Sequence, residues 1–407
     1  MGFRVDVWEG ARIALFSLKS NRLRTLLTTV GIGVGVCTLL AIVGIIQGLN
    51  TSFSDQLAQM GTNTLFIRKF PWVMNGDWWQ YRNRKDLTVD LVDVVRQSEY
   101  VIAVTPVLGG NADISFAGRQ VSSVQVRGAT ADYAQVMSNE LTSGRFLTEA
   151  DQESRNPVAV LGADVARELF PHLDPLGHRI VVKQKPYTVV GVLAAKGQIL
   201  GESQDLIVVV PYNTFLGQFG KKQSPQLMVA VDSPDNLLKA EDQLIALLRR
   251  ARGTAPGAPD DFSINRPDQL ANTYQQLTGA LYGAATGVGL ITLLVGGIGI
   301  MNIMLVSVRE RTREIGIRRA LGARRRTIVI QFLMEAASVS AVGGALGTAV
   351  GLGLAKVVSL ITPLAAAVQP LTVVFGVGFS AVVGLLFGIW PAARAAHLDP
   401  VEALRHE

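Results

Sequence analysis

The amino-acid sequence predicts a membrane α-helical protein with four transmembrane helices and a large extracytoplasmic α+β domain inserted between helices 1 and 2. Four stretches with few or no charges are long enough to cross a bilayer, which takes about 20 apolar residues. A segment of about 225 residues with ordinary polar content separates the first stretch from the second. The basic residues gather beside the apolar stretches, as they do in membrane proteins.

The four predicted spans contain the longest apolar stretches of the chain. They cover residues 26–49, 277–308, 327–361 and 371–391. The third span contains only two charged residues, Glu335 and Lys356, and an external turn at 362–370 separates it from the fourth. The first apolar run is too long for a signal peptide and no small-residue cleavage pattern follows it, so we expect a retained anchor.

Clusters of Lys and Arg predict the orientation of the chain. They occupy residues 12–24, 309–326 and 394–405. Because such clusters stay on the cytoplasmic side, we expect the basic amphipathic segment 1–25, the loop 309–326 and the tail 392–407 to lie inside. Both termini are then cytoplasmic, and residues 50–276 lie outside.

Strand and helix patterns alternate within residues 50–276. Apolar runs predict strands at 121–126, 179–183, 187–191 and 206–210. Helices are predicted at 164–170 and at 236–250, the second with Ser233 as its cap and Pro234 in its first turn. The mixture indicates an α+β domain, with α/β as the alternative.

The loop at 309–326 holds eight Arg and two Glu, a local charge of +6 that equals the net charge of the whole chain. If the loop is helical, Ile317, Ala320 and Leu321 share one face. Arg311, Glu314 and Arg318 then share another, with Glu314 and Arg318 at the favourable i,i+4 spacing, and Gly322 ends the helix. This order predicts a docking element for a cytoplasmic partner; the alternative is a solvated loop that only sets the topology.

Sequence patterns for catalysis are missing. There is no GxxxxGK[ST] loop to hold phosphate, no HExxH and no GxSxG. His172 and His178 are expected outside the membrane and His397 and His406 inside, so they offer no shared metal geometry. We therefore expect neither a catalytic nor a metal site. The pI near 9.5 could indicate nucleic acid, but basic residues beside apolar spans fit lipid headgroups better.

Glycines recur four residues apart in two of the predicted spans, a spacing that lets membrane helices approach closely. They are Gly31, Gly35, Gly343, Gly347 and Gly351. The alternative is that glycine is simply common in membrane helices.

Aromatic residues cluster early in the inserted segment. Trp72, Trp78, Trp79 and Tyr81 could hold a hydrophobic ligand or partner. The alternative, which we favour, is that they pack onto their own domain or rest at the membrane interface.

Glu335 is the one acidic residue inside a predicted span. It could act as a proton relay. It lies only nine residues beyond Arg326, however, so we expect it to reach headgroups or an arginine of the loop.

Several segments resemble one family in the expected order. They are residues 18–28, 60–65, 144–146, 169–170, 174–177, 189–192, 299–326 and 391–404. The chain resembles the FtsX-like permease family of MacB-type ABC transporters. The resemblance implies a homodimer in the bacterial inner membrane that acts with two copies of an ABC ATPase. It further implies a periplasmic adaptor (membrane-fusion) protein and an outer-membrane channel.

The resemblance also implies that the loop after the second span couples to the ATPase. The matching positions are Arg309, Glu310, Arg311, Arg313, Glu314, Ile315, Gly316, Ile317, Arg318, Arg319, Leu321 and Gly322. MacB-type members carry their ATPase fused ahead of the first span, and no such domain precedes it here, so we expect a separate ATPase subunit. ATP and Mg²⁺ would bind that subunit, and this chain would bind no cofactor. Efflux of a hydrophobic compound or peptide is the expected activity, with lipoprotein release or FtsX-type signal transduction as alternatives.

Overall fold

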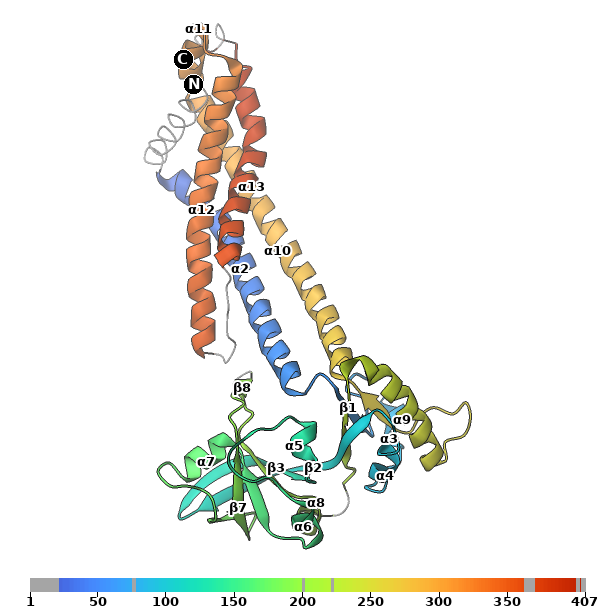
Figure 1. The fold of residues 1–407 in the computed structure, drawn as a ribbon. Coiled ribbons are helices and arrows are strands. Elements are labelled where there is room, and N and C mark those ends of the chain that lie inside the picture. The colour runs from blue at the N-terminus through green and yellow to red at the C-terminus, as the bar shows by residue number, and fades with distance from the viewer. Residues whose placement is uncertain are drawn as a thin grey trace. The chain divides into compact units, whose positions relative to one another are not determined.

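The computed structural model describes residues 22–74, 78–199, 202–220, 223–361, 370–399 and 403. The chain divides into two compact units (Figure 1). The membrane unit consists of Met1–Thr51 and Leu277–Glu407, and the inserted domain of Ser52–Gln276. Most of the predicted N-terminal segment, the external turn up to residue 369 and most of the tail from residue 400 lie outside the described residues.

The predicted fold class is confirmed. Within the described residues, four helices are long and apolar enough to cross a membrane, and the sheet-rich domain lies between the first and the second. They are α2 (Arg22–Gln59), α10 (Pro267–Glu310), α12 (Arg325–Ile361) and α13 (Pro370–Ala396). A short helix, α11 (Thr312–Ala320), connects α10 to α12. The helices α2 and α10 are longer than the predicted spans, because each continues into the inserted domain.

Small residues bring the membrane helices together. A β-carbon added at Gly347 of α12 would lie 2.3 Å from the carbonyl oxygen of Gly33 in α2. Gly343 and Gly351 face α2 as well, while Gly31 and Gly35 of α2 face α10. All five predicted glycines therefore lie at helix contacts. In lipid the hydrophobic effect does not drive helices together, so close van der Waals packing at such glycines stabilises the contacts. Gly33, which the sequence reasoning missed, makes the closest of these approaches.

The inserted domain is built on a ten-stranded sheet. Nine strands follow the order β12-β1-β11-β2-β3-β10-β5-β7-β4, and β6 pairs with both β2 and β7. The bounds are β1 Thr64–Arg68, β2 Val101–Phe116, β3 Arg119–Ala129, β4 Leu141–Gly144, β5 Val158–Leu161, β6 Arg179–Val182, β7 Lys185–Leu193, β10 Ile207–Pro211, β11 Gln226–Val231 and β12 Ser263–Asn265. A separate hairpin pairs β8 (Gln198–Ile199) with β9 (Glu202–Ser203). The four strands predicted at 121–126, 179–183, 187–191 and 206–210 are confirmed as β3, β6, β7 and β10.

Short helices connect the strands of the sheet. They are α3 Trp79–Arg82, α4 Leu91–Val95, α5 Tyr133–Val136, α6 Glu149–Glu153, α7 Ala163–Leu169, α8 Tyr212–Phe219, the 3₁₀ turn η1 Pro234–Asn236 and α9 Leu237–Arg252. The two predicted helices are confirmed as α7 and as η1 with α9, and the Ser233 hydroxyl accepts a hydrogen bond from the backbone N–H of Asp235. One core lies between α4, α9 and strands β1, β2 and β11, and another between α7, α8 and strands that include β3, β7 and β10.

The long strand β2 belongs to both parts of the sheet. Its first half, from Val101 to Val107, pairs with β11, and its second half, from Leu108 to Phe116, pairs with β3. One continuous backbone therefore connects these two cores, and a third cluster, which includes Ala103 and Val107 of β2, also draws on both parts of the sheet.

Close packing at Gly347 predicts that a larger residue at this position lowers the stability of the protein, whereas one at an open position of the same helix does not. In Gly347→Ala the new methyl group collides with the backbone of α2, so we expect overpacking to cost about 1–3 kcal/mol. Thermal unfolding of the purified protein in detergent measures this. Gly353→Ala in the same helix is the control, since nothing lies within 4 Å of its added β-carbon. Equal melting temperatures for the two variants would contradict the assignment.

A charged capping box in α6 predicts a pH-dependent contribution to stability. The Asp151 carboxylate accepts hydrogen bonds from Arg145 Nη1 at 2.6 Å and from the backbone N–H of Thr148 at 3.0 Å. These contacts, Arg145 first, hold the pKa of Asp151 well below its usual range. The carboxylate therefore stabilises the fold above the unfolded-state pKa, near 3.9, and this stabilisation is lost as the pH falls toward the folded-state pKa.

We expect Asp151→Asn to cost about 2 kcal/mol at neutral pH. The cost should shrink at pH 3, because the unfolded wild-type chain takes up a proton there before the folded one does. Thermal unfolding at both pH values tests this, with the exposed Asp235→Asn as control. A cost that does not change with pH would refute the electrostatic account.

Candidate functional site

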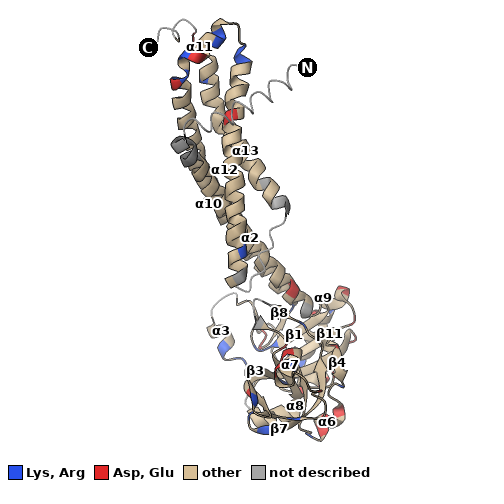
Figure 2. Ribbon diagram, turned by 90° about the vertical axis from the view of Figure 1, so that its left-hand side faces the viewer, with Lys and Arg blue, Asp and Glu red and all other residues tan. Residues whose placement is uncertain are grey.

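The predicted basic loop folds as a helix between two corners. Arg311 separates α10 from α11 with a non-helical backbone (φ −103°), and Gly322 ends α11 in the left-handed region (φ +97°). The backbone N–H groups of Gly322 and Ala323 donate to the carbonyls of Arg319 and Arg318, as in a glycine-capped helix end. Arginine residues gather at α11 and the corners beside it, whereas the apolar helices that meet there carry few charged residues (Figure 2).

One face of α11 is buried against the ends of the membrane helices. Ile315 is 3% exposed and packs in a cluster with Met304 of α10 and Ile328 of α12. A β-carbon added at Gly316 would lie 2.6 Å from the β-carbon of Ala403. Ile315 and Gly316, which the family resemblance placed among the coupling residues, therefore face the interior and hold the helix in place.

Arginine side chains fasten α11 to its neighbours. Arg318 Nη1 donates to Gln331 Oε1 of α12 at 3.0 Å, and Arg318 also pairs with Glu314, the pair predicted from the i,i+4 spacing. Arg319 Nη1 donates to the carbonyl oxygens of Ala396 at 2.9 Å and Leu398 at 2.7 Å. The helix is thus tied to α12 on one side and to the end of α13 on the other.

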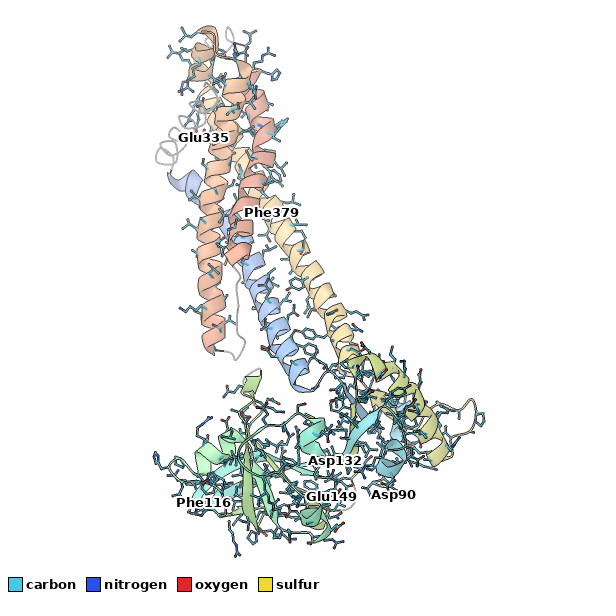
Figure 3. All side chains as sticks on the ribbon, viewed as in Figure 1. Asp90, Phe116, Asp132, Glu149, Glu335 and Phe379 are labelled. Atoms are coloured by element: carbon cyan, nitrogen blue, oxygen red, sulfur yellow. The ribbon has the colours of Figure 1, made fainter. Side chains whose placement is uncertain are left out.

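Glu335 supplies a further attachment. It lies on the part of α12 nearer to α11 (Figure 3), is 7% exposed, and its carboxylate is 3.5 Å from Arg311 Nη1. Of the roles considered for this residue, the structure shows the one in which it reaches an arginine of the loop. The ion pair connects the corner between α10 and α11 to α12.

The opposite side of α11 is exposed and carries an apolar patch, made of Ile317, Ala320 and Leu321. Ile317 is 41% exposed and Leu321 83% exposed. The exposed residues around it are mostly charged: Arg309, Glu310, Arg313, Glu314, Arg324, Arg325 and Arg326. An exposed apolar patch bordered by charge is typical of a surface that docks another protein. We call this patch with its charged border the docking face.

The aromatic residues of the inserted domain divide between packing and exposure. Trp72 is half-buried against Phe66, with ring centroids 4.9 Å apart, and its backbone N–H donates to Asn265 Oδ1 at 2.7 Å. Tyr81 lies under the Arg84 guanidinium at 4.7 Å. Trp78 and Trp79 are 46% and 68% exposed, although the ring of Trp78 also stacks on Phe70 with centroids 5.5 Å apart. The structure thus packs Trp72 onto its own domain, leaves Trp79 largely at the surface and gives Trp78 one packed and one exposed side.

Within the described residues, no three His, Cys, Asp or Glu side chains are grouped closely enough to hold a metal ion. His397 lies at the end of α13, with Nδ1 2.8 Å from the carbonyl oxygen of Ala393.

Comparison with known proteins matches both units. The family model described as "MacB-like periplasmic core domain" matches residues 25–247, more than half of the chain, and "FtsX-like permease C-terminal" matches residues 286–400. The protein named "Macrolide export ATP-binding/permease protein MacB" is 37% identical in Azoarcus sp. (strain BH72), over 99% of this chain and 60% of the relative. Its counterpart in Wolinella succinogenes is 36% identical over 99% of this chain and 61% of the relative.

A crystal structure of the periplasmic region of MacB from Actinobacillus actinomycetemcomitans is also similar. It has 24% identity and a TM-score of 0.44, over 55% of this chain and 97% of that chain. This chain spans about 60% of the length of the curated relatives it matches.

The four membrane helices, the inserted domain and the sequence matches define a permease of an ABC transporter. The chain belongs to the MacB-like branch of the FtsX-like permease family. It is accordingly a multi-pass protein of the inner membrane.

The attachment of α11 predicts how its mobility can be changed. Arg319→Ala removes two hydrogen bonds from a charged donor, which together stabilise the docked helix by about 1.5 kcal/mol or more. We therefore expect amide hydrogen exchange across residues 312–320 to become roughly tenfold faster, while the inserted domain is unaffected. Exchange followed by mass spectrometry measures this. Replacement of the exposed Arg313 by Ala is the control. Equal exchange rates in both variants would contradict the conclusion that Arg319 holds α11 against the end of α13.

Proposed function

We propose that this chain is the permease subunit of a MacB-like ABC transporter, and that it couples ATP hydrolysis on a separate ATPase subunit to movements of its inserted domain. The observation that carries the proposal is the construction of α11. Its inner face is fixed to α10, α12 and the end of α13, and its docking face is exposed. A helix held in this way moves together with the membrane helices when a partner pushes on it.

The helices that continue into the inserted domain provide the route for such a movement. The α10 helix begins in the inserted domain and is 44 residues long, or about 66 Å, and a single residue, Arg311, separates its end from α11. Where α2 and α10 enter that domain, the rings of Phe53 and Tyr274 stack with centroids 3.8 Å apart. A displacement of α11 would therefore reach the inserted domain through continuous helices that are joined to each other.

The partner at the docking face is proposed to be an ABC ATPase that binds ATP and Mg²⁺. The 407 residues contain no phosphate-holding loop of the GxxxxGK[ST] type, so hydrolysis requires another polypeptide or domain. Closure of two ATPase copies would drive two permease copies, which makes a homodimer the working unit. The termini and the loop around α11 would then lie in the cytoplasm, in agreement with their positive charge.

For the cargo we propose a hydrophobic compound or peptide, expelled through a pump completed by a periplasmic adaptor and an outer-membrane channel. The support is similarity alone: the curated relatives over the full chain are named as macrolide exporters. The exposed Trp78 and Trp79 are a further surface that an adaptor could contact.

Charge placed in the docking face should uncouple the transporter. We expect Leu321→Asp to reduce the permease-dependent stimulation of ATPase activity about tenfold or more, because a central apolar contact of an interface contributes about 2 kcal/mol. The measurement is ATP hydrolysis by an ABC ATPase of the MacB type, reconstituted with the permease in nanodiscs. Leu238→Asp, at a leucine that is 62% exposed in α9, is the matched control. Full stimulation by Leu321→Asp would disprove docking at α11.

A further inference from the structure

A groove on one face of the inserted domain has no part in the coupling described above. Its volume is about 540 Å³, within the range of about 300–1,000 Å³ that is usual for ligand pockets. Residues of strands β1, β11, β2 and β3 line it, at the place where β2 changes partners. All of its lining residues belong to the inserted domain.

Gly109 of β2 leaves open space in the wall of the groove. This glycine is exposed, and a β-carbon added to it would meet no atom within 4 Å. It lies within a strand and its φ is not positive, so the backbone conformation itself does not require glycine. A side chain at this position would therefore fill the groove without straining the strand.

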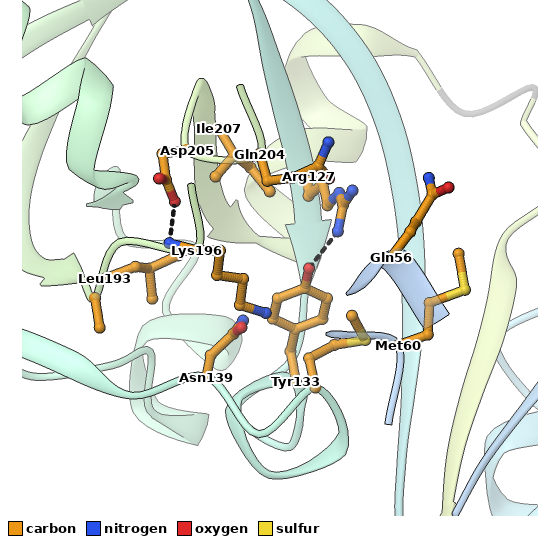
Figure 4. A pocket seen from close by; sticks show the side chains of 12 residues that line it. Gln56, Met60, Arg127, Tyr133, Asn139, Leu193, Lys196, Gln204, Asp205 and Ile207 are labelled. Carbon is orange, nitrogen blue, oxygen red and sulfur yellow. Dashed lines mark hydrogen bonds between the residues drawn. The ribbon is translucent and has the colours of Figure 1, made fainter. Parts of the chain in front are cut away.

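Two arginines line the groove. Within the described residues the Arg68 side chain makes no ion pair or hydrogen bond, and the protein around it lowers the pKa of its guanidinium. Arg127 also lines the smaller cavity drawn in Figure 4, where its Nη1 donates to Tyr133 Oη at 2.6 Å. Its Nε and Nη2 donate to Gln125 Oε1, so all of its hydrogen-bond partners are neutral. These bonds use three of the five guanidinium N–H groups and leave two for a ligand.

The other charged residues of the groove neutralise each other. Lys69 Nζ lies 2.8 Å from Asp86 Oδ1. The lining residues therefore carry two cations, Arg68 and Arg127, that no lining carboxylate balances. Carboxylates of a ligand would complement them, because a guanidinium binds a carboxylate through two parallel charge-assisted hydrogen bonds.

The register of the sheet gives the separation of the two arginines. Arg68 follows the last residue of β1 that pairs with β11, which puts it beside Gln226. Gln226 pairs with Val107 of β2, and two residues further along β2, Gly109 pairs with Arg127. Three strand spacings of about 4.8 Å and two residue steps of about 3.3 Å separate the α-carbons of the two arginines by about 16 Å.

An extended ligand with a carboxylate near each end fits this separation. The first and last α-carbons of an extended chain of about five residues are about 13 Å apart, and side chains supply the remaining reach. The groove also offers the amides of Gln223 and Gln226, which can exchange hydrogen bonds with peptide groups. Val107, Leu108 and Met228 provide an apolar part of the wall.

We propose that this groove binds an extended peptide segment of about five residues that carries a carboxylate at each end. Arg68 and Arg127 each hold one carboxylate, and the amides of Gln223 and Gln226 contact the peptide groups between them. This inference goes beyond the proposed function, because neither the ATPase nor α11 takes part.

Two sets of end-capped pentapeptides test the site. Both sets have random residues at the central positions, and the first set has Glu at each end where the second has Gln. The full chain in zwitterionic nanodiscs is mixed with both sets, and the free peptides are measured by ultrafiltration and mass spectrometry, with empty nanodiscs as the blank. We expect the Glu set to bind about tenfold more tightly, because hydrogen bonds between two charged groups are stronger than those of a neutral amide.

Two variants of the groove locate the binding. Arg68→Gln removes a charge without leaving a partner unpaired, and Gly109→Leu fills the open space. Each should lower the affinity for the Glu set about tenfold. Arg119→Gln, at an exposed arginine of β3 outside the groove, is the control and should leave the affinity unchanged.

Equal binding of the two peptide sets by the wild-type chain, or unchanged affinity in either groove variant, would overturn the proposal. Sebacate, a dicarboxylate without peptide groups, should compete poorly. If it competes as well as the Glu peptides, the assignment of the groove to a peptide is wrong. Because no nucleotide is present, these results are independent of the coupling experiment.

Discussion

The structure depends on one constraint of the bilayer, namely that every backbone N–H and C=O group inside it must be paired within the protein. Helices satisfy this requirement without interruption, so the membrane unit consists of long continuous helices. The same continuity lets α2 and α10 extend into the inserted domain without a break in their hydrogen bonding. The pairing that the bilayer requires is thereby kept in both helices as the chain passes from the membrane unit to the inserted domain.

The arginines at the end of these helices fall into two groups, one with partners in neighbouring helices and one exposed. Arg311, Arg318 and Arg319 turn toward α12 and the end of α13, where they make ion pairs and hydrogen bonds. The five remaining arginines of the loop are exposed and contribute most of the positive surface: Arg309, Arg313, Arg324, Arg325 and Arg326. Orientation in the membrane requires only the total charge, whereas the fixed position of α11 requires particular partners.

Sequence reasoning predicts those features that depend on local composition. The fold class, four strands and two helices follow from apolar runs and caps. The burial of α11 is different: periodicity places Ile317, Ala320 and Leu321 on one face but cannot tell which face is covered, and here Ile315 and Gly316 are the buried residues because α10, α12 and Ala403 surround them. The contact of Gly33 with α12 could not be predicted for the same reason. Only the path of α12 distinguishes Gly33 from Gly31 and Gly35, which face α10.

Strand β2 was not predicted, because Pro106, Gly109, Gly110 and Asn111 in its middle are residues typical of turns. They are tolerated because the strand changes partners there, from β11 at Val107 to β3 at Leu108. The mechanical consequence is that the two parts of the sheet are not bodies on a linker. The strand β2 runs through both, and a third apolar cluster, with Phe66 and Met228 from one part and Val160 and Val209 from the other, packs across them, so a pull that separates the parts has to break ladder hydrogen bonds and side-chain packing together.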